Sequence, residues 1–99
     1  MLELFYNRDG SPIGLEEWCR RTVDREYLRI DQTTLPDGKW VSTVWQGLNH
    51  RFGEGPPLIF ETMVFTSQEE METIDQQRYA TENEAILGHQ EMVAKYLEG

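Results

Sequence analysis

The strongest constraint on the fold is a pair of β-patterned stretches joined by a tight turn. Residues 26–34 alternate between apolar and polar side chains, with Leu28 and Ile30 on one side, as in a half-buried strand. Residues 35–38 read Leu-Pro-Asp-Gly, which is strong turn chemistry, and a β pattern resumes over 39–47. So short a connection predicts an antiparallel hairpin.

Two further strands and a helix are predicted before residue 67. Residues 2–6 form a short apolar stretch that an Asp-Gly turn ends, which indicates a strand. Residues 14–24 carry Leu15, Trp18, Cys19 and Val23 at spacings of three and four, which predicts a short amphipathic helix. Residues 58–66 are apolar on both sides, as in a strand covered on both faces or central in its sheet.

The last third of the chain predicts a polar loop and a closing helix. Residues 67–76 are polar and acidic and are expected to be an exposed loop, with a weak strand signal over 77–80. Thr81 and Glu84 have the spacing of a capping box, so a helix is expected from there to about Leu97. Gly88 lies inside this helix and lowers its stability by about 1 kcal/mol relative to alanine. A close packing contact would explain a glycine here, and so would a tolerated weakness.

Together these elements predict a small α+β fold. The expected order is β-α-β-β-β(-β)-α, with a mainly antiparallel sheet of four to five strands and two helices packed on one face. Ninety-nine residues leave room for one hydrophobic core, so residues 1–99 are expected to form a single domain.

The charge of the chain is negative and unevenly distributed. The net charge is −9, and residues 52–99 hold ten acids against two bases, whereas residues 1–51 hold eight acids and seven bases. Such a surface repels a phosphate backbone, so direct nucleic-acid binding is not expected. It favours a partner with a basic surface, although solubility alone would also explain it.

The motifs of common enzymes and metal sites are missing from the sequence. There is no phosphate-binding glycine loop, no dinucleotide fingerprint and no zinc-protease motif, and the two histidines lie far apart. Cys19 lies on the apolar side of its helix and is expected in the core; a single cysteine also gives no sign of an oxidising compartment. The sequence therefore predicts no enzyme, cofactor or metal, and a cytoplasmic location without a membrane span.

One segment is a candidate binding loop. Residues 49–57 combine a histidine, an arginine and a phenylalanine with two glycines and two prolines, between two strong strands. A plain hairpin connection would explain the same composition. Glu61 follows among apolar neighbours, and needs a partner such as Arg51 or His50 if its face is covered. The candidate binding residues are Trp45, Asn49, His50, Arg51, Phe52 and Glu61. The candidate acidic patch is Glu69, Glu70, Glu72 and Asp75.

Several motifs together resemble a family of short uncharacterised proteins encoded mainly in bacteriophages and prophages, notably of actinobacteria. They are VSTVWxGLxH over 41–50, GxGPPLIFETMVF over 53–65, RYxT over 78–81 with EA at 84–85 and GH at 88–89, and DGxPI over 9–13. The acidic stretch 67–76 departs from the pattern. The resemblance implies a small phage accessory protein, and such proteins often act by binding a host component.

Three functions are expected, and they are given from the most to the least favoured by the sequence. The first is binding of a host protein with a basic surface, for instance one of antiviral defence, through the acidic surface and the 49–57 loop. The second is binding or sequestering of a small ligand such as a nucleotide, with Trp45, His50 and Arg51 supplying stacking and charge. The third is a structural, virion-associated role. Pairing of an edge strand with its copy would make a homo-oligomer.

Overall fold

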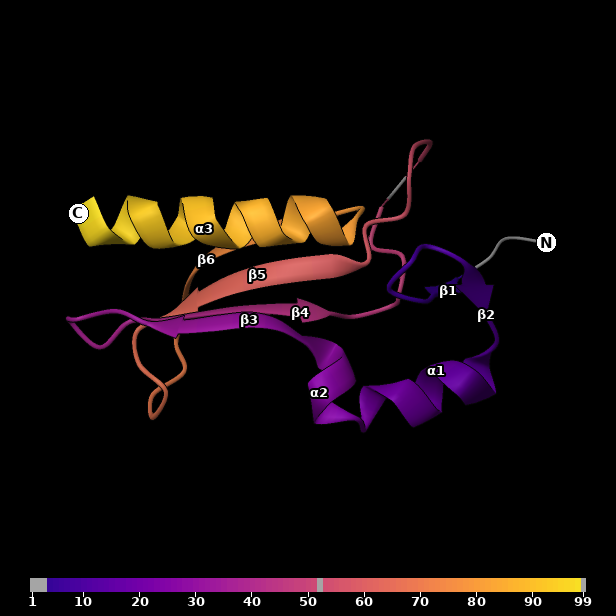
Figure 1. The fold of residues 1–99 in the computed structure, drawn as a ribbon, viewed down its shortest axis with the longest axis horizontal. Coiled ribbons are helices and arrows are strands. Elements are labelled where there is room, and N and C mark those ends of the chain that lie inside the picture. Colours follow the sequence, from indigo (N-terminus) through magenta and orange to yellow (C-terminus); the bar gives the residue numbers. More distant parts are fainter. Residues whose placement is uncertain (1–3, 52, 99) are drawn as a thin grey trace.

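The computed structural model describes residues 4–51 and 53–98, in which a short hairpin and two helices precede a sheet and a closing helix (Figure 1). In order they are β1 (Phe5–Tyr6), β2 (Pro12–Ile13), α1 (Leu15–Thr22), α2 (Arg25–Leu28), β3 (Arg29–Thr34), β4 (Trp40–Trp45), β5 (Phe60–Phe65), β6 (Thr73–Tyr79) and α3 (Glu82–Glu98).

The main sheet is a four-stranded antiparallel meander. Its strands lie in the order β3-β4-β5-β6, so each strand pairs with its neighbour in sequence. The predicted hairpin is confirmed, because Thr34 pairs with Trp40 across the turn. β1 and β2 form a separate two-stranded hairpin. The predicted α+β class with an antiparallel sheet is therefore what the structure shows.

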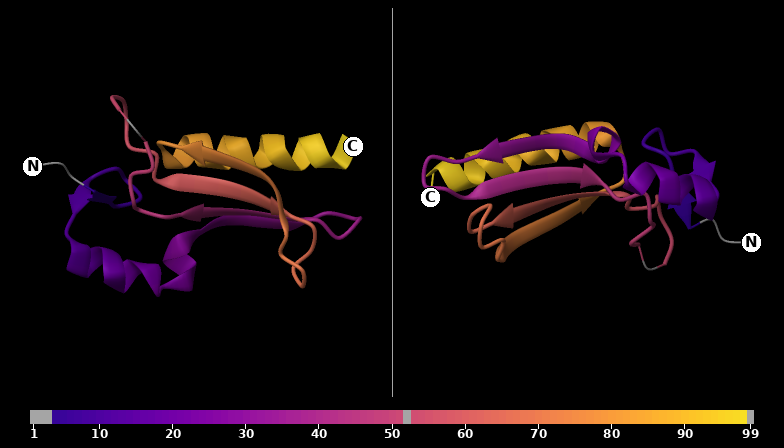
Figure 2. Two further views of the ribbon diagram at one scale, coloured as in Figure 1. Left: turned by 180° about the vertical axis from the view of Figure 1, so that it is seen from behind. Right: turned by 90° about the horizontal axis from the view of Figure 1, so that it is seen from below.

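One face of the sheet is covered by α3, which contacts all four strands (Figures 1 and 2). The first predicted helix forms as α1, but it contacts α2 and β1 at the end of the molecule. The reason lies in Trp18, whose indole Nε1 donates to the Gln46 carbonyl 2.9 Å away. This bond holds α1 beside the chain that leaves β4, and not along the face that α3 covers.

Two boundaries differ from the prediction. Residues 26–28 are not strand but belong to α2, because the Asp24 side chain accepts a hydrogen bond from the Tyr27 amide and begins a helical turn. Residues 73–76 are not loop but strand, since β6 begins at Thr73 and pairs with β5. The exposed acidic loop is therefore 66–72. The strand predicted over 2–6 lies partly outside the described residues, which show β1 at its end.

The core lies between α3 and the sheet and has a polar centre. Apolar clusters flank it, one around Val41 and Val64 and one around Trp45 and Phe60. Between them His89 is buried, its Nδ1 is 2.7 Å from Thr43 Oγ1, and its Nε2 is 2.9 Å from Thr33 Oγ1. Thr43 also bonds to Thr62 on β5. A chain of hydrogen bonds thus joins the helix to three strands.

The glycine in α3 has a structural reason. A Cβ built on Gly88 would lie 2.2 Å from Cε1 of Tyr79, a distance that real Cβ atoms essentially never show. The Tyr79 ring therefore packs directly on the helix backbone. The alternative of a tolerated weakness is removed by this contact. The capping box at the start of α3 is confirmed as well, because the Glu84 amide donates to Thr81 Oγ1 and the Thr81 amide to Glu84 Oε1.

We expect Gly88→Ala to destabilise the protein by about 1–3 kcal/mol, because overpacking outweighs the better helix propensity of alanine. Urea unfolding of the variant and the wild type measures the difference. Ala94→Gly on the exposed side of the same helix is the control, and should cost about 1 kcal/mol through propensity alone. A Gly88→Ala variant more stable than the wild type would contradict the packing contact.

The stability of the protein should fall as the pH falls through the range in which free histidine titrates. Burial lowers the pKa of His89 below its ordinary 6.5, although Asp31, whose Oδ2 is 3.7 Å from Nε2, opposes this. The unfolded chain then binds a proton that the folded chain refuses, so stability is lost below about pH 6.5.

Urea unfolding at about pH 7.5 and about pH 5.5 tests this expectation. His50 is the only other histidine in the chain, and burial lowers its pKa too. Most of the loss should persist in His50→Gln and disappear in His89→Gln. A slope that survives in His89→Gln would show that another group carries it.

Candidate functional site

A largely apolar hollow of about 400 Å³ lies between α1, α2 and the end of β4. We call it the α1 groove. Trp18 and Thr22 line it from α1, Leu28 from α2, Val44 from β4, and Leu48 and His50 from the segment that follows. Apolar concave surfaces with a few polar groups at the rim are the usual form of binding sites.

Two indoles and one glycine build the closed end of the groove. Trp45 is buried, and its Nε1 donates to the Tyr6 carbonyl at 2.9 Å. The Trp18 ring lies 4.7 Å from that of Phe5. Gly47 has φ of 73°, and a Cβ there would lie 2.3 Å from Trp45 Cζ2 and 2.8 Å from Trp18 Cδ1. Both indoles therefore pack on the backbone at Gly47, and only glycine fits.

The apolar stripe of α1 continues the groove onto the surface. Leu15 is 59% exposed and Val23, just past the end of the helix, is 81% exposed. Helical spacing places Leu15 beside both Trp18, which lines the groove, and Cys19. The prediction that Cys19 is buried is wrong, because this cysteine is exposed. The amphipathic pattern was correct, but within Leu15–Thr22 no residue is fully buried, and Trp18 is partly buried against the core.

The 49–57 loop is fixed by its own hydrogen bonds. The Asn49 side-chain oxygen accepts from the Arg51 amide at 2.9 Å and from the Leu58 amide at 3.2 Å, so it joins the two ends of the loop. The Arg51 guanidinium Nε donates to the Pro56 carbonyl at 2.6 Å. Asn49 and Arg51 thus hold the connection, and Phe52 lies outside the described residues.

His50 is the loop residue that reaches the groove. It is partly buried, and burial together with the charge of Arg78 holds its pKa below the ordinary value. Glu61 acts in the opposite direction on the same pKa. A neutral imidazole can donate one hydrogen bond and accept another, so His50 supplies a polar group at the rim.

Trp45 and Glu61 are held by structural contacts with their neighbours. Glu61 does not bond to Arg51 or His50, the partners that the sequence suggested. The buried carboxylate of Glu61 accepts from Gln46 Nε2 at 2.7 Å and Gln76 Nε2 at 2.6 Å. It also lies 3.1 Å from Nε of Arg78. The strand register places Arg78 opposite Glu61, so the pairing follows from the position of β6, which the sequence signalled only weakly.

The candidate acidic patch divides into two parts. Glu69, Glu70 and Glu72 are exposed on the 66–72 loop. Asp75 lies in β6, and its Oδ2 accepts from Lys95 Nζ at 2.8 Å and Tyr96 Oη at 2.7 Å. The bond from Lys95, and then that from Tyr96, lower the pKa of Asp75 to about 2. Asp75 therefore ties β6 to α3 and does not act with the loop.

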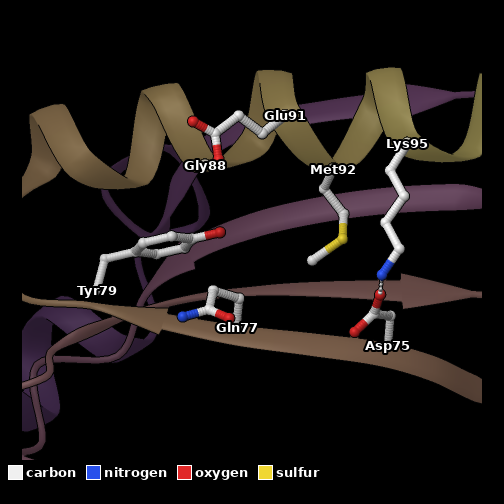
Figure 3. A pocket seen from close by; sticks show the side chains of 7 residues that line it. All are labelled: Asp75, Gln77, Tyr79, Gly88, Glu91, Met92 and Lys95. Atoms are coloured by element: carbon white, nitrogen blue, oxygen red, sulfur yellow. Dashed lines mark hydrogen bonds and ion pairs between the residues drawn. The ribbon is translucent and has the colours of Figure 1, made fainter.

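A second hollow, also about 400 Å³, lies between β6 and α3 (Figure 3). Figure 3 shows the ion pair of Asp75 and Lys95 closing one end of it and the Tyr79 ring lying at the other, beneath Gly88. Glu91 faces it from the helix. The Asp75–Lys95 pair in its lining is engaged in holding α3 on the edge strand, so it is a weaker candidate than the α1 groove.

The described ranges contain neither a cluster of metal ligands nor a membrane-spanning helix. Across 4–51 and 53–98, no group of three or more His, Cys, Asp or Glu side chains is placed to hold a metal ion. Within the same ranges, no helix has the length and apolar character needed to cross a membrane.

We expect Asn49→Ala to loosen the 49–57 loop, because two amides lose their acceptor, at a cost of about 1–3 kcal/mol. Hydrogen exchange at Arg51 and Leu58 should accelerate, while exchange in β4 stays slow. Asn49→Asp keeps the side-chain acceptor and serves as the control. Unchanged exchange in Asn49→Ala would show that the loop does not depend on this residue.

Comparison with known proteins identifies no relative of this chain. No protein-family model matches it, and searches of curated proteins and of solved structures found no match. The resemblance to phage-encoded proteins therefore stays a prediction, and the functional argument rests on the geometry described above.

Proposed function

We propose that this protein is an interaction module that receives an apolar side chain of a partner protein in the α1 groove. The observation that carries the proposal is the apolar stripe of α1, in which Leu15, Cys19 and Val23 are exposed, on a helix whose Trp18 and Thr22 line the groove. A strongly amphipathic helix normally buries its apolar side. Exposed apolar surface next to an apolar hollow is typical of protein-binding sites.

The shape of the site suggests how a partner would bind. The groove offers apolar contacts to an anchor residue, and His50 at its rim offers a hydrogen bond. Leu15 and Val23 would then pack on the apolar surface around that anchor. Large side chains in desolvated pockets dominate the energy of protein interfaces, and the surrounding contacts mainly exclude water.

The charge of the chain supports a partner with a basic surface. At a net charge of −9, long-range attraction speeds the encounter with a positively charged protein, whereas the apolar groove decides the final fit. The phage resemblance supports a host protein as the partner, with the proteins of antiviral defence as one target class. We infer an accessory role exerted by binding.

The experiment compares two pairs of substitutions with matched exposure. Leu15→Glu with Val23→Glu alters the stripe of α1, and Leu87→Glu with Leu97→Glu alters α3, where the leucines are 59% and 56% exposed. All four positions are exposed, so both proteins should fold. A crosslinker attached to the exposed Cys19 captures a partner from host lysate, and calorimetry with the purified partner then measures affinity.

The partner should bind the wild type and the α3 variant equally and the α1 variant at least about tenfold more weakly, which is about 1.4 kcal/mol. Equal affinity for all three proteins would overturn the proposal, and so would the absence of any partner whose capture depends on α1.

A further inference from the structure

Among the described residues, no helix lies across the middle of the sheet face opposite α3 (Figure 2, right), and Ser42 and Glu61 on that face are buried by their neighbours. Because side chains alternate along β4, Val41, Thr43 and Trp45 face α3, and Trp40 and Val44 face the other way. The Trp40 ring stacks on that of Phe65, with 5.4 Å between centroids. Trp40 and Val44 are only partly buried by the described residues, so this face offers accessible apolar surface.

A hollow of about 320 Å³ runs along β3 and β4 on this face, and its lining is apolar except for two arginines and Gln32. We call it the arginine hollow. Leu28, Trp40 and Val44 form the floor, and the exposed Arg25 and Arg29 stand at the rim. In a chain with twice as many acids as bases, these two exposed arginines offer positive charge to a partner, and the exposed Asp24 and Glu26 flank Arg25 in the sequence.

The 66–72 loop lies at one end of the same face. It folds to the side away from α3, as Figure 1 and the left view of Figure 2 both show. The Gln68 side chain donates to Thr34 Oγ1 at 3.2 Å, at the end of β3 remote from Arg29. The two arginines of the hollow and the loop therefore stand at opposite ends of β3, and the floor of the hollow runs between them to Trp40, which pairs with Thr34.

The tip of this loop is complementary to the arginine hollow in shape and in charge. Met71 is 50% exposed, and the acidic, exposed Glu70 and Glu72 flank it. The tip is held in place, since the Met71 amide donates to the Ser67 carbonyl at 3.0 Å and the Thr66 amide to the Glu72 carbonyl at 2.9 Å. An apolar projection with acidic neighbours thus matches an apolar hollow with basic neighbours.

We propose that a second copy of this chain docks on the open face, with Met71 of each copy in the arginine hollow of the other. A two-fold axis brings each end of a face onto the opposite end of its partner's face, so both contacts form at once. Glu70 and Glu72 of one copy then lie against Arg25 and Arg29 of the other. A methionine side chain is flexible enough to fill a shallow, irregular hollow.

The extents of the molecule limit the area that such a dimer can bury. Viewed from below, as in the right view of Figure 2, the molecule has extents of 45 Å and 20 Å. A standard stable interface takes about 800 Å² from each partner. The acidic remainder of each copy, including the outer side of α3, lies away from the contact, where mutual repulsion is weakest.

The test is a charge exchange between two variants. Arg25→Glu with Arg29→Glu makes the hollow acidic, and Glu70→Lys with Glu72→Lys makes the loop basic. All four side chains are exposed, and circular dichroism verifies that each variant folds. Sedimentation equilibrium over a concentration series gives the dimer dissociation constant of each variant alone and of the equimolar mixture. Glu91→Lys with Glu98→Lys on α3 is the control.

The wild type and the control should dimerise. Each charge variant alone should dimerise at least about tenfold more weakly, because like charges meet at both contacts. Their mixture should recover a one-to-one dimer. The acidic loop of the arginine variant then meets the basic hollow of the glutamate variant, and the acidic hollow of the arginine variant meets the basic loop of the glutamate variant. A monomeric wild type, charge variants that dimerise normally, or a mixture that stays monomeric would each overturn the proposal.

Discussion

The contact between α3 and the sheet carries the structure, and His89 is its centre. A buried imidazole with two threonine partners fixes the position of α3 across β3 and β4. If the helix shifted relative to either strand, buried polar atoms would lose their hydrogen bonds. Tyr79 adds a steric limit, since its ring meets the backbone at Gly88. The helix therefore has one position on the sheet. Because α3 covers only one face of the sheet, the opposite face is left to solvent or to a partner.

The end of β4 decides where the first third of the chain goes. Trp45 and Trp18 both pack on Gly47, and their indole nitrogens bond to the Tyr6 and Gln46 carbonyls. These contacts hold the β1–β2 hairpin and α1 beyond the sheet. The groove arises because Trp18 and the stacking of Arg21 on Tyr27 hold α1 there, while Leu15 and Cys19 stay exposed. The site is thus a consequence of how the N-terminal segment is anchored.

Local patterns predicted most of the elements, because each depends on residues close in sequence. The capping box placed the start of α3, and the turn at 35–38 placed the β3–β4 hairpin. Two errors came from the same source. Asp24 caps a helical turn at 25–28 within a stretch that alternates like a strand, and Asp75 belongs to a strand within a stretch that reads as an acidic loop.

The candidate site was harder to predict, because it depends on contacts between distant segments. Cys19 lies on an apolar stripe, and nothing in that pattern tells whether another element will cover it; the bond from Trp18 to Gln46 settles the matter. Glu61 was correctly singled out as needing a partner. The partner, Arg78, could be identified only once the register of β6 was known. His50 is the one predicted loop residue that lines the groove.

The two proposed surfaces meet at Leu28 and Val44, which line both the α1 groove and the arginine hollow. A dimer that fills the hollow and a partner in the groove would both contact these two side chains. Any shift of Leu28 or Val44 in one complex changes the surface offered to the other. If partner binding alters the dimer affinity by some factor, dimerisation alters the partner affinity by the same factor. A small acidic protein built this way would couple its own assembly to the capture of its target.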